Sequence, residues 1–208
     1  GSIGAAASSD FAAGTRPWSF QAFLYFPGPG WATSYPCFFF DTRVGGSPGG
    51  SSLILEITDA GKLKIERQYY GSVTSNASLP TGSWVHVAAF YDGTTEYIYF
   101  NGALDTATSV GAVALTNGNC WCFGPNDAPS ILNPLCYVAE MQFSVGVSQF
   151  VGGGATITVP TGAVAQGYNP ALLPASPAAG QLAASPYALY ICTNATGPVW
   201  KRSSLSSI

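Results

Sequence analysis

Residues 82–102 read GSWVHVAAFYDGTTEYIYFNG, which has the form of two strands joined by a tight turn at Asp92-Gly93. Side chains of a strand point alternately to its two faces. One face of the first strand carries Trp84, His86, Ala88 and Phe90, and the other carries Val85, Val87, Ala89 and Tyr91. Both faces are largely apolar, which predicts a central strand covered by an opposing sheet on one side and by loops or a partner on the other.

The same alternation of strand-like runs and turn residues extends from residue 17 to residue 146. The clearest other runs are WSFQAFLYF (18–26), CFFFDTR (37–43), SLILEIT (52–58), KLKIERQYY (62–70), CWCFG (120–124) and CYVAEMQFSV (136–145). Gly, Pro, Asn or Asp follows most of them, as expected at turns between antiparallel strands. No window has apolar residues at helical spacing, with caps, over more than two turns, so the sequence predicts an all-β fold.

The composition limits the partners of the chain. Hydrophobic residues make up 47% of the 208 residues and charged residues only 8%, with a formal net charge of -3. A chain with so few basic residues, and no cluster of them, is not expected to bind nucleic acid. The apolar runs are far shorter than the roughly 20 residues that a membrane-spanning helix needs, so we expect no membrane insertion.

Residues 79–104, LPTGSWVHVAAFYDGTTEYIYFNGAL, resemble the signature hairpin of laminin G-like domains in the concanavalin A-like lectin and glucanase superfamily. The positions that match are Trp84, His86, Val87, Ala88, Tyr91, Asp92, Gly93, Tyr99, Asn101 and Gly102. Weaker similarity covers roughly residues 16–150. The resemblance implies an antiparallel jelly-roll β-sandwich, and we place this domain at residues 1–150.

The chain changes character after residue 150. Residues 151–208 are rich in Ala, Gly, Pro and Ser, and the prolines between 160 and 186 suit an extended strap or linker. The segment YALYICTNATGPVWKRSS (187–204) has the form of strand, turn and strand. We therefore expect an extended C-terminal arm that ends in a hairpin.

The sequence does not supply the groups that catalysis would need. A retaining glycosidase needs two carboxylates about 5 Å apart, but the spacing of Glu56 and Asp59 puts them on opposite faces of a strand. No G-x-S-x-G elbow accompanies His86, the only histidine. We expect His86 to be a neutral imidazole that hydrogen-bonds a loop carbonyl or hydroxyl, and we expect no enzymatic activity.

Aromatic side chains in loops are the candidates for sugar binding, because exposed rings stack on the C–H faces of sugars. These candidates are Trp31, Tyr35, Tyr69, Tyr70 and Trp121, with Tyr168 as a weaker one. Trp31 is the most suggestive, since no strand alternation buries it.

The sequence requires no cofactor, but it contains candidate ligands for a metal ion. Asn126 and Asp127 in GPNDAP could donate oxygens to a rim Ca²⁺, and Asp41 and Asp92 are further rim candidates. Each of these residues is also an ordinary turn former. Five cysteines leave at least one unpaired, and one disulfide is a simpler prediction than a zinc site.

Two settings fit a recognition domain of this kind. The first is a virion structural or attachment protein, at the virion surface, whose partners are a glycan or host receptor and other virion proteins or copies of itself. The second is a secreted or cell-surface laminin G-like module. This setting is favoured by the sequons at Asn76 and Asn194 and by the odd number of cysteines. A glycoside hydrolase is the third and weakest interpretation.

Overall fold

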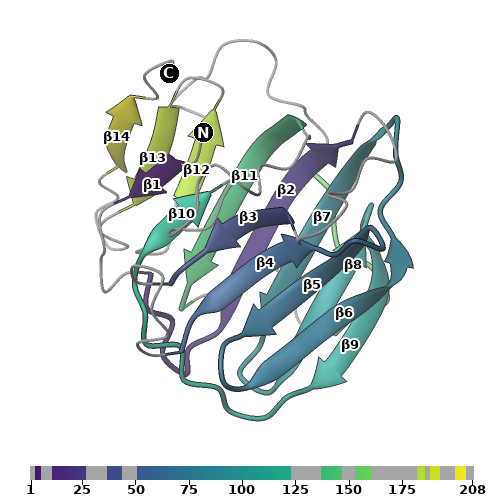
Figure 1. Ribbon diagram of the computed structural model, residues 1–208, viewed down its shortest axis with the longest axis horizontal. Helices are drawn as coiled ribbons and strands as arrows, with labels where there is room; N and C mark the ends of the chain where they lie inside the picture. Colours follow the sequence, from purple (N-terminus) through teal and green to yellow (C-terminus); the bar gives the residue numbers. More distant parts are fainter. Residues whose placement is uncertain are drawn as a thin grey trace.

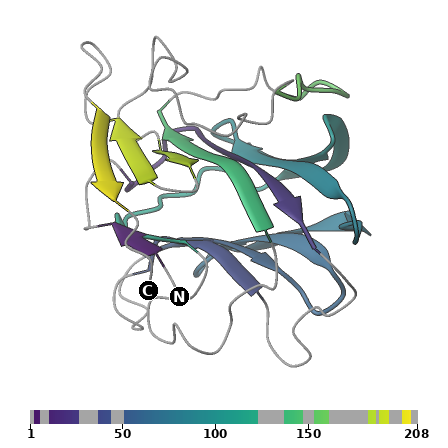
Figure 2. The ribbon, with the colours of Figure 1, turned by 90° about the horizontal axis from the view of Figure 1, so that it is seen from above.

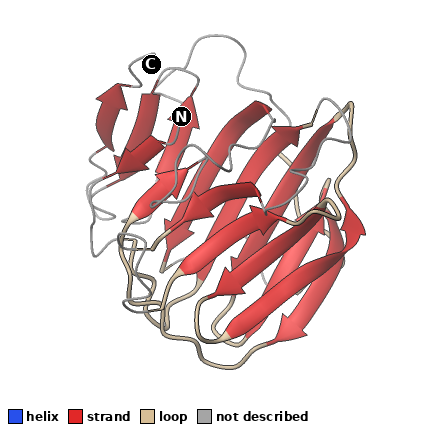
Figure 3. Ribbon diagram, in the orientation of Figure 1, coloured by secondary structure: helices blue, strands red, loops and turns tan. Residues whose placement is uncertain are grey.

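The computed structural model describes residues 3–5, 11–26, 37–43, 51–122, 137–146, 153–160, 182–185, 188–192 and 200–204. Within these residues the chain forms antiparallel strands in two sheets and no helix, which confirms the predicted β-sandwich (Figures 1 and 3). None of the described segments could cross a membrane as a helix.

The smaller sheet has six strands. In spatial order they are β1 (Ile3–Ala5), β10 (Cys120–Cys122), β3 (Cys37–Asp41), β4 (Leu53–Ile57), β5 (Lys62–Arg67) and β6 (Gly71–Ser78). The predicted alternation in β5 is confirmed, because Leu63 and Ile65 are buried while Lys62, Lys64 and Glu66 on the other face are partly exposed. The run KLKIERQYY does not continue as a strand to its end, since a turn begins after Arg67.

The larger sheet has eight strands. In spatial order they are β14 (Trp200–Ser204), β13 (Ala188–Cys192), β12 (Leu182–Ser185), β11 (Tyr137–Val145), β2 (Trp18–Tyr25), β7 (Trp84–Tyr91), β8 (Thr95–Phe100) and β9 (Ala103–Ser109). β13 and β14 are antiparallel neighbours, and β12 joins them to β11. The C-terminal strands thus continue the sheet that contains the signature hairpin.

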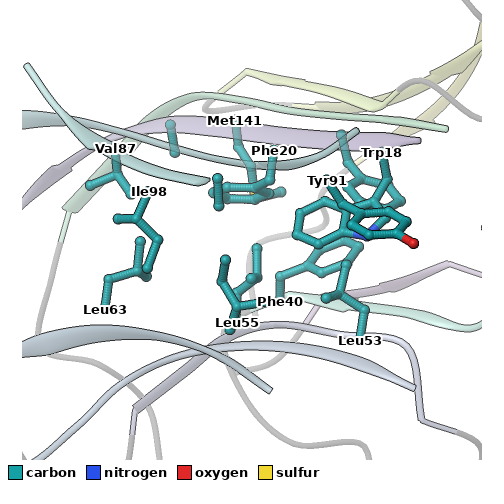
Figure 4. Packing of buried hydrophobic residues seen from close by; sticks show 14 of the residues in the cluster. Trp18, Phe20, Phe40, Leu53, Leu55, Leu63, Val87, Tyr91, Ile98 and Met141 are labelled. Atoms are coloured by element: carbon teal, nitrogen blue, oxygen red, sulfur yellow. The ribbon is translucent and has the colours of Figure 1, made fainter. Parts of the chain in front are cut away.

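The core lies between the two sheets, as the view along the layers shows (Figure 2). Aromatic rings fill its centre, where Phe40 of the six-stranded sheet lies 4.5 Å from Phe143 and 5.8 Å from Phe20 of the other sheet, centroid to centroid. The inward residues of β7 and β8, among them Val87, face this cluster (Figure 4). Burial of this apolar surface is the main stabilising contribution to the fold.

A buried ion pair interrupts the apolar core at one end of the sandwich. Arg67 of β5 and Glu96 of β8 point inward from opposite sheets, with Nε 3.2 Å from Oε1 and side-chain exposures of 4% and 0%. Burial raises the pKa of Glu96 to about 7, although the charge of Arg67 acts in the opposite direction. The pair therefore couples the stability of the sandwich to pH.

Asp105 joins the edges of the two sheets. Its carboxylate accepts hydrogen bonds from the backbone N–H groups of Asn76 at 2.7 Å and Ala77 at 2.9 Å, which belong to edge strand β6. The Nδ2 of Asn76 donates to the Asp105 carbonyl oxygen at 2.9 Å. These contacts satisfy donors of an edge strand that would otherwise be open to pairing with another chain.

Candidate functional site

The outer face of the eight-stranded sheet is the face directed away from the six-stranded sheet. On β7 the alternation expected from the sequence is present, because Val85 and Val87 lie in the core while Ala88 and Phe90 form a separate cluster with Tyr99. Ser19, Gln21, Phe23 and Tyr25 of the neighbouring β2 share this outer face with Trp84 and His86. The face thus combines aromatic rings with uncharged polar groups.

Trp84 and Tyr25 form an aromatic platform at one end of this face. They are register partners on β7 and β2, and their ring centroids lie 5.6 Å apart at an interplanar angle of 52°. Trp84 is 50% exposed although it belongs to a central strand. Thr81, Ser83 and Asn101 are exposed nearby and supply hydroxyl and amide groups at the rim.

A ladder of uncharged side chains crosses three strands beside the platform. Nε2 of Gln21 donates to Oε1 of Gln142 at 2.7 Å, so Oε1 of Gln21 faces Nε2 of His86 at 3.1 Å as an acceptor. His86 therefore carries its proton on Nε2, and its Nδ1 is a buried acceptor that has no hydrogen-bond partner among the described residues. The partner of His86 is a strand amide and not the loop group expected from the sequence, because Gln21 lies on the same face one strand away.

A β-bulge in β11 brings Gln142 into this ladder. The register with β2 shifts between Ala139 and Gln142, and Glu140 adopts a positive φ of 53°. The bulge turns Met141 into the core and leaves Gln142 opposite Gln21 on the outer face. Bulges commonly re-aim side chains in this way.

His86 is expected to remain neutral down to about pH 5. It is 1% exposed, and burial lowers its pKa to about 4. A lowered pKa means that the contribution of His86 to stability is complete above pH 6.5 and is lost as the pH falls through 4. Because the chain has one histidine, the proton NMR signal of its Cε1–H can be followed alone. A titration midpoint near 6.5 would contradict the buried, neutral ring.

The part of the outer face formed by β8 and the neighbouring half of β7 is covered by residues 153–160, which we term the strap. The phenol of Tyr99 donates to the carbonyl oxygen of Gly154 at 2.7 Å, and Ile157 packs on the cluster of Ala88, Phe90 and Tyr99. The backbone N–H of Ile157 donates to the carbonyl oxygen of Gly102 at 2.8 Å. Figure 2 shows the strap, in light green, on the outer side of the eight-stranded sheet. Among the side chains described on this face, Trp84 is therefore the one aromatic ring that is half exposed.

Of the aromatic residues proposed from the sequence, the two whose side chains are described lie away from the platform. Tyr69 and Tyr70 lie in the turn between β5 and β6, 67% and 48% exposed, at the end of the sandwich opposite Trp84. Tyr69 has a positive φ of 73°, an unfavourable conformation for a residue with a side chain. Trp121 lies in strand β10, between Gly4 and Asp41, and not in a loop. Trp31 and Tyr35 lie outside the described residues, as does Tyr168.

The proposed calcium residues Asn126 and Asp127 also lie outside the described residues. Asp41 is paired with Arg43 at 2.7 Å. Asp92 accepts from the backbone N–H groups of Thr94 and Thr95 within its own turn. Although partial burial acts to raise it, these hydrogen bonds hold the pKa of Asp92 below its usual value. Among the described residues no three His, Cys, Asp or Glu side chains gather around a common point.

Glu56 and Asp59, the two carboxylates considered for catalysis, differ in burial. Glu56 is buried and pairs with Lys64 at 2.7 Å, and its burial raises its pKa. Asp59 lies exposed in the turn after β4. Neither the cysteine side chains nor Asn194 fall within the part whose side chains are described.

Sequence reasoning placed Trp84 on a packed face and did not name it or Tyr25 as ligand residues. One signal was available, because Trp84 is the first residue of its strand and follows the polar stretch Thr81-Gly82-Ser83. A strand end next to a polar turn lies at the rim of a sheet, where an aromatic ring is only half covered.

Comparison with known proteins gives a family match and several similar solved structures. A laminin G-type family model, described as the concanavalin A-like lectin/glucanases superfamily, matches residues 1–131. The CBM40 domain of the Ruminococcus gnavus IT-sialidase, solved with α2,3-sialyllactose, is 13% identical with a TM-score of 0.50, over 62% of this chain and 74% of that one. The LG4-5 domains of the mouse laminin α1 chain are 15% identical with a TM-score of 0.46, over 62% of this chain and 35% of that one. A search of curated proteins finds no match.

Proposed function

The chain belongs to the concanavalin A-like lectin/glucanases superfamily, and we propose that it is a recognition module that binds carbohydrate on the outer face of its eight-stranded sheet. The observation that carries this proposal is the half-exposed ring of Trp84 beside Tyr25. A large apolar side chain in this position is left in water by the free protein and can be covered by a ligand.

The chemistry of the platform suits a sugar. An aromatic ring offers a flat apolar surface to the C–H groups of a pyranose, while hydroxyl and amide groups orient the sugar by hydrogen bonds. Asn101 is held in place for this role, because its Oδ1 accepts the His86 backbone N–H at 2.9 Å and its backbone N–H donates to the His86 carbonyl oxygen at 2.8 Å. The rim is therefore ordered before a ligand arrives, which lowers the entropic cost of binding.

The proposed activity is binding without catalysis. The R. gnavus domain was solved with a bound oligosaccharide, which supports carbohydrate as the ligand class. Attachment at a virion surface is the setting that we favour, and a secreted module is the alternative. Both settings would use the same face.

A glycan array with the purified chain tests this function, run once with millimolar Ca²⁺ and once with a chelator. We expect specific binding that Trp84→Ala weakens about tenfold or more, since loss of a stacked aromatic ring costs on the order of 1–1.5 kcal/mol. Dependence on Ca²⁺ would point to Asn126 and Asp127.

Tyr70→Ala is the matched control, because Tyr70 is 48% exposed and Trp84 is 50% exposed. The control should bind like the unmodified chain. If Tyr70→Ala abolished binding while Trp84→Ala preserved it, the site would lie at the β5–β6 turn and the assignment to the outer face would be wrong.

A further inference from the structure

The positions of the positively charged side chains restrict the ligand that the Trp84–Tyr25 platform can recognise. The whole sequence has seven of them: Arg16, Arg43, Lys62, Lys64, Arg67, Lys201 and Arg202. An anionic sugar binds more tightly when a positively charged side chain lies near it. Without such a side chain the anionic group is desolvated unpaired, and the sugar binds more weakly. The location of each cation therefore decides between neutral and anionic ligands.

Four of the seven belong to the six-stranded sheet or its loops. Arg43 pairs with Asp41, and Arg67 pairs with Glu96 in the core. Lys64 contacts both Glu56 and Glu66 at 2.7 and 2.6 Å, and Lys62 lies next to it on the same strand. The core separates this sheet from the outer face of the other, since packed sheets lie about 10 Å apart.

The other three cations lie at the far margins of the eight-stranded sheet. Arg16 precedes β2 and donates to the carbonyl oxygens of Ala13 and Ala12. Tyr25 is at the opposite end of that strand, whose first and last residues lie roughly 23 Å apart at the rise of about 3.3 Å per residue. Lys201 and Arg202 lie on β14, four strand positions from β2 and five from β7 (Figure 1). These separations are roughly 19 and 24 Å at about 4.8 Å per strand.

His86 supplies no positive charge to the face either. Its Nε2 proton is donated to Gln21, which is itself fixed by its bond to Gln142. Burial lowers the pKa of His86 to about 4, so the ring stays neutral at physiological pH. The side chains described around the platform offer rings, hydroxyls and amides.

We propose that the Trp84–Tyr25 platform recognises an uncharged sugar, so that a carboxylate or sulfate on that sugar weakens binding. This inference rests on the proposed function and names its ligand class. A negatively charged group placed on the platform is desolvated without a counter-charge, in a protein whose own net charge is -3. A neutral sugar meets no such penalty and finds the hydrogen-bonding groups that it needs.

An array of paired glycans tests the inference. Each pair has one neutral member and one member that differs by a single sialic acid, uronic acid or sulfate. With the full chain at pH 7.4 and physiological salt, we expect the neutral members to bind at least fivefold better, and Trp84→Ala to remove that binding.

A second experiment introduces a positively charged side chain next to the platform by substitution. Ser83→Arg places a guanidinium beside Trp84 at an exposed position, and Ser72→Arg places one at an exposed position on β6 as the control. Ser83→Arg should improve binding of the anionic members at least threefold, in a manner that high salt reverses, and Ser72→Arg should not.

The outcomes separate the two claims. Equal or tighter binding of the anionic members, still dependent on Trp84, would overturn the inference and leave the carbohydrate-binding function standing. Absence of binding to every pair, or binding that Trp84→Ala leaves unchanged, would overturn both.

Discussion

Replacing Arg67 by methionine is expected to destabilise the sandwich by about 3–5 kcal/mol at pH 8, because it leaves the carboxylate of Glu96 buried without a counter-charge. Methionine keeps most of the apolar stem of arginine, so the loss reports on charge more than on packing. Among the residues that the structure describes, neither carboxylate oxygen of Glu96 has a hydrogen-bond partner, and Arg67 is its only ion-pair partner.

The effect should be much smaller at pH 5. The folded-state pKa of Glu96 is about 7, raised by burial from its ordinary value of 4.5. A raised carboxyl pKa means that the folded chain binds more protons than the unfolded chain between pH 4.5 and 7. Stability therefore falls as the pH rises through this window, by roughly 3 kcal/mol in total for this group. Below it Glu96 is protonated, and removal of Arg67 leaves no buried charge.

Urea unfolding at pH 5 and pH 8 measures this difference. The double variant Arg67→Met with Glu96→Leu removes both charges and should be close to the unmodified chain in stability at pH 8. His86 titrates alike in all these chains, so differences between variants isolate the ion pair. An equal loss at both pH values, or a double variant as unstable as the single one, would contradict the coupling of this pair to pH.

Gly102→Ala should cost about 2–4 kcal/mol, since a positive φ disfavours a side chain by roughly 1–2 kcal/mol and each lost strap hydrogen bond adds about 1. Gly102 has a φ of 81°, and a Cβ there would lie 2.8 Å from the carbonyl oxygen of Ile157 and 2.8 Å from Cγ2 of Val159. The strap must therefore move away, and the rings of Phe90 and Tyr99 beneath it would be uncovered.

Gly93→Ala is the matched control for this change. Gly93 also has a positive φ, 112°, but a Cβ there meets nothing within 4 Å. Urea unfolding should show a loss for Gly102→Ala that exceeds the control by about 1–3 kcal/mol. Binding of a hydrophobic dye should rise for Gly102→Ala alone. Equal losses in the two variants would mean that the strap contributes nothing at Gly102.

The signature hairpin could be predicted from sequence because both faces of its first strand are packed. Both sets of alternating side chains are therefore constrained to be largely apolar. Central strands β2 and β7 bury one face in the core and most of the other under neighbouring groups, so their residue types are strongly constrained. The edge strands β6 and β9 escaped prediction for the opposite reason. Their sequences, GSVTSNAS and ALDTATS, are mostly exposed, and such strands carry little hydrophobic pattern.

The site was harder to predict than the fold. Loop aromatics such as Tyr69 are visible in a sequence, whereas the pairing of Trp84 with Tyr25 depends on a strand register set by residues 59 positions apart. The hydrogen bonds through Gln142 likewise depend on the β-bulge in β11, which no sequence pattern predicts. What the sequence did indicate correctly is that His86 lies within a packed face.

Heteronuclear NMR of the full chain, titrated with a neutral oligosaccharide from the array, shows whether sugar binds beside Trp84. The indole Nε1–H of Trp84, assigned by its loss in Trp84→Phe, should shift in proportion to saturation. The ring signal of His86, two residues along the same face, should shift with it. Signals of Tyr69 and Tyr70, at the opposite end of the sandwich, should stay unchanged. Shifts confined to Tyr69 and Tyr70, with Trp84 and His86 unaffected at saturation, would contradict the account.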